Sequence, residues 1–254
     1  ILESSLNFSH ENKDLFLGMR ASVFEDLNVT TKSDEYEYIL PDIILDKNLF
    51  SSNKYGAADI RSNINMHNYE TNKTTRFLIN DLDWRHKEIN YGPGLKGQFL
   101  GKLKNINYEA KNTLVYKDDA TNELFGAVGY LSQLNLFKNT GNGSKHFLTP
   151  KLLLRYAPNH MRKESGSNRL DHLSMFKLDR LKSNKNFEGG LSSTLGADYQ
   201  LKKNDKKLDF SIAQIINEKE NKNMPSSSSL DQRFSDIVGQ SKLKLNKKTT
   251  INYN

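Results

Sequence analysis

"LTPKLLLRYAP", residues 148–158, alternates bulky apolar side chains with polar and charged ones before it ends at a proline. Leu152 and Leu154 fall on one side of an extended chain, and Lys151 and Arg155 fall on the other, because successive side chains of a β-strand point to opposite faces. Such a strand lies either on a soluble core or between lipid and water. That choice decides which function classes are open to the chain.

The same period of two recurs along the whole chain, in segments of about ten residues, the length of a tilted membrane-spanning strand. This exceeds the five or six residues of a usual soluble strand. The regular segments are 2–9, 15–26, 56–69, 189–202 and 236–246, and the less regular ones are 36–45, 74–87, 95–108, 124–137, 147–156, 208–217 and 249–254. We therefore predict an all-β fold, an antiparallel transmembrane β-barrel segment of about 10–12 strands.

Two segments depart from this pattern. Segment 124–137 is apolar on both faces, with Phe125, Leu131 and Phe137 on the second face, which predicts that something packs there. Segment 172–181 has apolar residues at roughly helical spacing, so a short helix is possible.

Composition narrows the class of protein. The 254 residues carry a net charge of +7, which favours an anionic partner. There is no cysteine and no run of 18 apolar residues, which excludes a disulfide scaffold and a transmembrane helix. Long polar connections alternate with short turns, as in outer-membrane barrels. We expect residues 1–254 to be a fragment of one β-barrel domain.

Catalytic signals are weak, and we predict no enzyme activity, metal site or cofactor. The six histidines lie far apart in the sequence, without metal-ligand spacing. There is no nucleophile elbow and no phosphate-cradling glycine loop. Asp81 and Asp83 share a strand face and could bind a cation, but two carboxylates facing water are the more common case.

Six basic residues fall on the polar faces of their strands: Arg20, Arg61, Lys151, Arg155, Lys242 and Lys244. They could form a cationic lumen for the phosphate or carboxylate groups of a ligand, or a solvated wall without ligand preference. The aromatic residues are not interleaved with them, so nucleic-acid binding is not expected.

Five aromatic residues near strand ends are candidates for an aromatic girdle at the membrane boundary: Tyr69, Trp84, Tyr108, Tyr156 and Tyr199.

Four stretches, in this order, resemble the membrane domain of the LptD family of outer-membrane lipopolysaccharide-assembly proteins. They are YEYILPDI (36–43), LTPKLLLRYAP (148–158), MFKLDRLKSNKNFEGGLSSTLGADY (175–199) and LDQRFSDIVGQSKLKLN (230–246). One departure is Asp179, where the family usually has asparagine.

The resemblance implies a location in the outer membrane of a Gram-negative bacterium and a barrel of about 26 strands. It implies no enzyme activity, but delivery of lipopolysaccharide to the outer leaflet through a lateral gate. The implied partners are lipopolysaccharide, membrane lipids, the lipoprotein LptE in the lumen, and an LptA-like periplasmic bridge that reaches a missing N-terminal domain. Leu148, Leu152, Leu154 and Tyr156 would then face lipid. Thr149, Lys151 and Arg155 would face a water-filled interior.

Two alternatives remain open at this point. One is a general porin or a TonB-type receptor barrel, although the apolar second face of segment 124–137 favours a packed guest over an open pore. The other is a soluble or surface glycan-binding β-sandwich, whose apolar faces would pack on each other.

Overall fold

A computed structural model describes residues 1–27, 36–69, 71–158, 162–163, 169–246 and 249–253. These residues form fourteen strands in one antiparallel sheet, which confirms the predicted all-β class. Twelve strands follow one another along the main path of this sheet in sequence order, and the short strands β6 and β9 pair beside it. No helix in the described part is long and apolar enough to cross a membrane.

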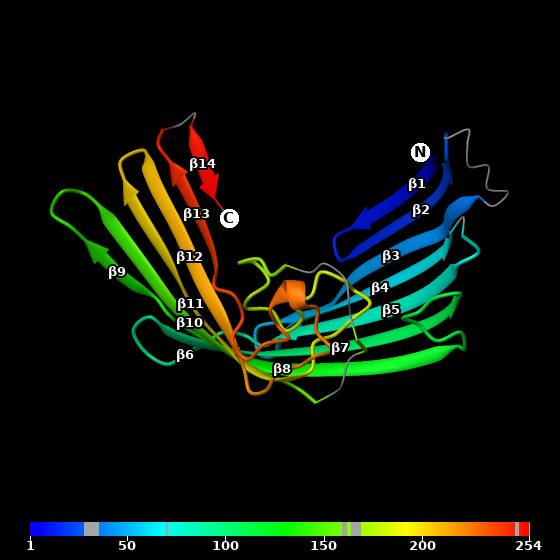
Figure 1. The fold of residues 1–254 in the computed structure, drawn as a ribbon. Helices are drawn as coiled ribbons and strands as arrows, with labels where there is room; N and C mark the ends of the chain where they lie inside the picture. Colours follow the sequence, from blue (N-terminus) through cyan, green and yellow to red (C-terminus); the bar gives the residue numbers. More distant parts are fainter. Residues whose placement is uncertain (28–35, 70, 159–161, 164–168, 247–248, 254) are drawn as a thin grey trace. The chain divides into compact units, whose positions relative to one another are not determined.

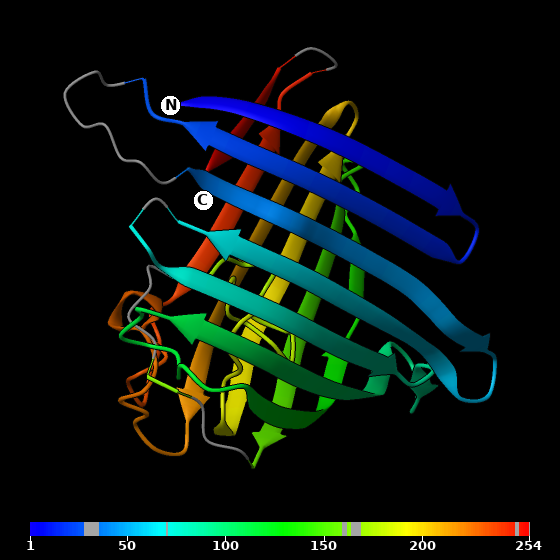
Figure 2. The same cartoon turned by 90° about the vertical axis from the view of Figure 1, so that its right-hand side faces the viewer.

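The chain divides into two compact units, residues 1–84 with 102–125 and residues 85–101 with 126–254. Unit 1 holds β1 (Leu2–Asn12), β2 (Leu15–Glu25), β3 (Glu37–Ser52), β4 (Gly56–Asn68) and β5 (Thr74–Arg85), with the second part of β7 (Leu95–Lys111) and the start of β8 (Thr121–Leu134). Strands β1 to β5 run side by side, each antiparallel to the next (Figure 2).

Unit 2 holds the rest of β7 and β8, together with β6 (Ile89–Asn90), β9 (Leu136–Asn139), β10 (Lys145–Ala157), β11 (Gly190–Lys203), β12 (Lys206–Asn217), β13 (Val238–Lys244) and β14 (Thr250–Tyr253). Short links join β11 to β12 and β13 to β14, whereas long connections join β10 to β11 and β12 to β13 (Figure 1). Strands of 11 to 17 residues dominate both units, as the ten-residue periodicity predicted.

Strand β3 is longer than the predicted segment 36–45 because it stays paired with β4 as far as Ser52, and it passes through Pro41 without leaving the sheet. The pairing of β3 with β4 shifts between Ile39 and Asp42, on either side of this proline. A proline has no N–H to donate to a ladder, and a bulge is one of the few places where a sheet accepts it.

Segment 124–137 is two strands, not one. The ladder breaks at Asn135, whose backbone N–H donates to the carbonyl of Gly94 at 2.8 Å. Gly94 has φ +79°, and a Cβ placed there would lie 2.4 Å from the Asn135 carbonyl oxygen, so only glycine fits this approach. The break places Phe137 on β9, where it is exposed and stacks on Phe147.

The helix considered for residues 172–181 is wrong. Residues 172–176 form turns, in which the Ser174 N–H donates to the Asp171 carbonyl and the Lys177 N–H donates to the Ser174 carbonyl. The apolar residues in this segment have a different role, because they pack against the sheet of unit 2, as described below.

Candidate functional site

Strands β10, β11 and β12 form a sheet with two chemically different faces. Directly paired residues of neighbouring strands point to the same side, so the register assigns every side chain to a face. We call the two sides the apolar face and the covered face. The apolar face carries Leu148, Leu152, Leu154, Tyr156, Leu191, Leu195, Ala197, Tyr199, Leu201, Leu208, Phe210 and Ile212.

The apolar face is open. Seven of its large side chains are between 38 and 50% exposed, among them Leu148, Tyr156, Leu195 and Phe210, and the others are half-buried. A soluble protein rarely leaves so many neighbouring apolar side chains uncovered. In a β-sandwich they would be buried against a second sheet, whereas a face toward lipid is expected to look like this.

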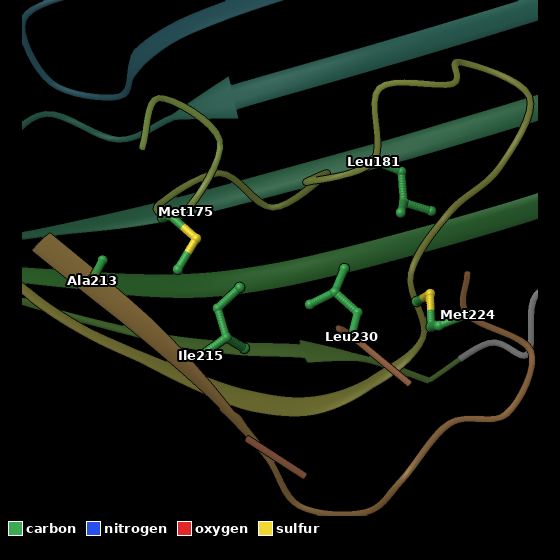
Figure 3. Close-up of a cluster of buried hydrophobic side chains, with 6 residues drawn as sticks. All are labelled: Met175, Leu181, Ala213, Ile215, Met224 and Leu230. Atoms are coloured by element: carbon green, nitrogen blue, oxygen red, sulfur yellow. The ribbon is translucent and has the colours of Figure 1, made fainter. Parts of the chain in front are cut away.

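The covered face is buried along half its length by the two long connections. Six buried apolar side chains form a core there, two from residues 169–189, two from β12 and two from residues 218–237: Met175, Leu181, Ala213, Ile215, Met224 and Leu230. Figure 3 shows these side chains pointing toward one another from the strand and the two connections. Leu178 extends the contact to β8, since its Cδ2 lies 2.6 Å from the position that a Cβ on Gly129 would take.

The sequence predicted that something packs on the second face of segment 124–137. At Gly129 this is Leu178 of the same chain. The guest at this point is the chain's own β10–β11 connection.

A buried charge cluster fixes the β10–β11 connection to the covered face. The guanidinium of Arg180 donates to both carboxylate oxygens of Glu188, with Nε–Oε2 at 2.7 Å. It also donates to the hydroxyls of Ser192 on β11, at 2.8 Å, and of Thr194, at 3.3 Å. The Thr194 hydroxyl in turn donates to the Met175 carbonyl at 3.1 Å.

Arg155 completes this cluster from β10. Its Nε donates to the Leu178 carbonyl at 2.7 Å, a second N–H donates to the Glu188 carbonyl, and Nη1 lies 3.8 Å from Glu188 Oε1. The expectation that Arg155 faces open water is wrong: the residue is on the predicted face but only 1% exposed, because the connection lies over it. Its role here is to hold the connection down.

Glu188 is ionised within this cluster. Burial alone would raise the pKa of its carboxyl, but the positive charges of Arg180 and Arg155, with the hydrogen bond from Arg180, outweigh burial and hold the pKa below its usual range. The buried guanidinium groups thus have a full negative charge opposite them.

The six predicted basic residues do not form one group. Four of them have acidic partners: Arg20 pairs with Glu3, Arg61 lies 3.9 Å from Asp46, Lys151 pairs with Asp198, and Arg155 joins Glu188. Lys242 and Lys244 are exposed on the covered face of β13, near its end. A role for any of the six toward a ligand stays a prediction.

The five girdle candidates also separate. Tyr156 is half-exposed on the apolar face, and the Tyr199 hydroxyl lies 2.8 Å from His146 Nδ1 on that same face. Tyr69 stacks on His67, and the Trp84 indole N–H donates to the Tyr55 carbonyl. Tyr108 is 4% exposed and packs with Phe77 and Tyr116, so it belongs to the core of unit 1.

Asp81 and Asp83 lie beside lysines, with the Asp81 side chain 13% exposed and the Asp83 side chain 47% exposed. Lys102 Nζ lies 3.1 Å from Asp81 Oδ1 and 2.7 Å from Asp83 Oδ2, and Lys104 approaches Asp81 at 3.6 Å. The cation that these carboxylates bind is a lysine of the adjacent strand.

Sequence periodicity missed the covering connections, because they have no regular period. The available signal was their isolated large apolar residues, such as Met175, Phe187, Met224 and Leu230, within otherwise polar and turn-rich sequence. Three of the four stretches that carry the family resemblance contribute to this packing. Stretch 148–158 contributes Arg155, stretch 175–199 contributes Arg180 and Glu188, and stretch 230–246 contributes Leu230.

Comparison with known proteins agrees with this resemblance. Residues 102–254, more than half of the chain, match the family described as LptD, LPS transport system D. No curated protein matches the chain. This match includes β10 to β14 and both covering connections, and it shows that the chain belongs to the LptD family, whose members are outer-membrane proteins of lipopolysaccharide transport and assembly.

Proposed function

We propose that this chain is the wall of an outer-membrane barrel that delivers lipopolysaccharide to the outer leaflet through a lateral gate. The observation that carries the proposal is the two-faced sheet of unit 2, apolar and exposed on one side, polar and charged on the other. A strand wall with lipid on one side and an aqueous path on the other has this composition.

The proposed partners follow from membership of the family and not from a contact in this chain. They are the lipoprotein LptE within the lumen and an LptA-like bridge that supplies lipopolysaccharide from the periplasm. The covering connections support a partly filled lumen over an open porin, because they occupy part of the covered face themselves.

The membrane orientation can be tested with single cysteines, since the native chain has none. Leu154→Cys and Leu195→Cys lie on the apolar face, and Thr149→Cys and Gln200→Cys on the covered face. In full-length protein in outer membranes, we expect a water-soluble maleimide to label the second pair and not the first. Equal labelling of both pairs would contradict the lipid-facing assignment.

Transport itself is tested in cells that are depleted of the native protein and then supplied with the wild-type protein. Surface lipopolysaccharide should disappear on depletion and return with the wild-type chain. Normal surface lipopolysaccharide in depleted cells would refute the proposed function whatever the labelling pattern.

A further inference from the structure

The short-link ends of β10 to β13 place four lysines side by side on the covered face. Lys145 pairs directly with Lys202, Lys202 with Lys207, and Lys207 with Lys244. We call these four residues the lysine row. Each pair joins neighbouring strands at the same height, so the four side chains follow one another across the sheet.

This arrangement is unfavourable for an isolated sheet. Directly opposed side chains have Cβ atoms about 5 Å apart, and like charges at this distance destabilise the pair. Elsewhere in the described strands, directly paired charges of opposite sign occur, as for Arg61 with Asp46 and Arg20 with Asp42. The lysine row instead joins four like charges, and one further like-charge pair, Lys203 with Lys206, lies at the same strand tips on the apolar side.

The residues next to the lysine row on the covered face add little negative charge. Asp209 faces the same side and is bonded to Lys207, with Nζ–Oδ2 at 2.7 Å, and to Gln200, with Nε2–Oδ1 at 2.6 Å. Lys242 stands opposite Asp209 in the ladder. These two rows therefore present five lysines against one aspartate, and Lys145, Lys202 and Lys244 are exposed.

We propose that the lysine row binds the phosphate groups of a lipopolysaccharide headgroup. Four ammonium groups spaced by one strand separation each extend over roughly 15 Å. A single phosphate reaches one or two of them, whereas a headgroup with several anionic groups spread over that distance neutralises the whole row. This favours a polyanionic glycolipid over a phospholipid with one charge. The ammonium groups are strong point-charge partners for phosphate oxygens.

The inference rests on the proposed transport function and gives it a contact site. The row lies at the strand ends joined by short links, and the charge cluster of Arg155, Arg180 and Glu188 lies toward the opposite ends of the same strands. Because short links mark the periplasmic side of outer-membrane barrels, a ligand that enters from the periplasm meets the lysine row first.

The test compares two triple variants with the same loss of charge. K145Q/K202Q/K244Q removes three members of the row and keeps the Lys207–Asp209 ion pair. K138Q/K203Q/K206Q removes three lysines from the same strand tips on the apolar side, as the pairs Lys138 with His146 and Lys203 with Lys206 indicate. Both variants are made in the full-length protein, purified in detergent with the partners that accompany it.

Binding is measured with fluorescent lipopolysaccharide at low and at high salt. We expect the first variant to bind about tenfold more weakly, since each screened lysine–phosphate contact contributes a factor of about two to three. The second variant should bind as the wild type does. High salt should narrow the difference between the variants. Lipopolysaccharide with its phosphates removed should bind wild type and first variant alike.

Three outcomes would overturn the inference. Equal binding of lipopolysaccharide by both variants would show that the lysine row is exposed to solvent and does not contact the ligand. Equal competition by phosphatidylglycerol vesicles would assign it to membrane phospholipid, and equal competition by inorganic pyrophosphate would show that any free phosphate satisfies it. The proposed function fails separately, if the wild-type protein does not bind lipopolysaccharide at all.

Discussion

The two ends of the covered face of unit 2 handle positive charge in opposite ways. At the end beneath the connections, Arg155 and Arg180 are buried against Glu188, two backbone carbonyls and two hydroxyls. At the short-link end, the lysine row has like charges as direct neighbours. Burying an unpaired charge costs several kcal/mol, whereas crowding charges in water costs a fraction of one.

This difference separates charges that belong to the packing of the fold from charges that solvent reaches. Where water is excluded, every guanidinium has a partner within the chain, so its charge is part of the packing. Where water enters, an excess of positive charge can persist until an anion neutralises it. The following predictions test this division, from the largest expected effect to the smallest.

Replacing Glu188 by glutamine should have the largest effect. The change leaves two buried guanidinium groups without their counter-charge, and breaking a buried ion pair in this way costs roughly 3–5 kcal/mol. The free energy of unfolding, measured by urea titration of the full-length protein in detergent, should fall by that amount. The matched control is E218Q, at an exposed glutamate of the other connection. A similar loss in both variants would remove the special role of the buried cluster.

Acid should weaken the same cluster. Because the pKa of Glu188 is lower in the folded protein than in the unfolded chain, its charge stabilises the fold fully above the usual glutamate range, and this contribution is lost as the pH falls through the lowered pKa. We expect the connections to become sensitive to an acid-active protease only below that range. In E188Q this increase in protease sensitivity at low pH should be missing. An unchanged increase would show that another titrating group causes it.

Leu230→Ala should destabilise unit 2 by about 3 kcal/mol, since it opens a cavity in the core shared by the two connections. Leu173→Ala, at an exposed leucine of the first connection, should change stability by less than about 0.5 kcal/mol. Urea titration measures both. If both losses are small, the connections do not depend on this core.

Lys151→Gln should have the smallest effect. Its ion pair with Asp198 is partly exposed, so solvent screening limits the contribution to about 0.5 kcal/mol. A double-mutant cycle with Asp198→Asn measures the coupling directly. A coupling above about 2 kcal/mol would place this pair with the buried cluster instead of with the solvated charges.

Strand periodicity predicted the sheet well, because a face between two media must alternate. In the regular segment 189–202 the alternating apolar residues all lie on the apolar face: Leu191, Leu195, Ala197, Tyr199 and Leu201. The long strand β3 and the break at Asn135 were not predicted, since both depend on backbone contacts that have no side-chain pattern.

The site was predictable only in part. The sequence indicated that Arg155 and Lys151 share a face, but not that only the first is buried, because burial depends on a connection without periodicity. The lysine row was missed for a related reason. Lys244 was among the predicted basic residues, but only the register of three ladders makes it a neighbour of Lys145, Lys202 and Lys207.

The shared core of the two connections has a consequence for the order of assembly. Met175 and Leu181 complete their packing when Ala213, Ile215, Met224 and Leu230 are also in place. Until β12 and the later connection are formed, the apolar side chains of the β10–β11 connection therefore stay partly exposed to water.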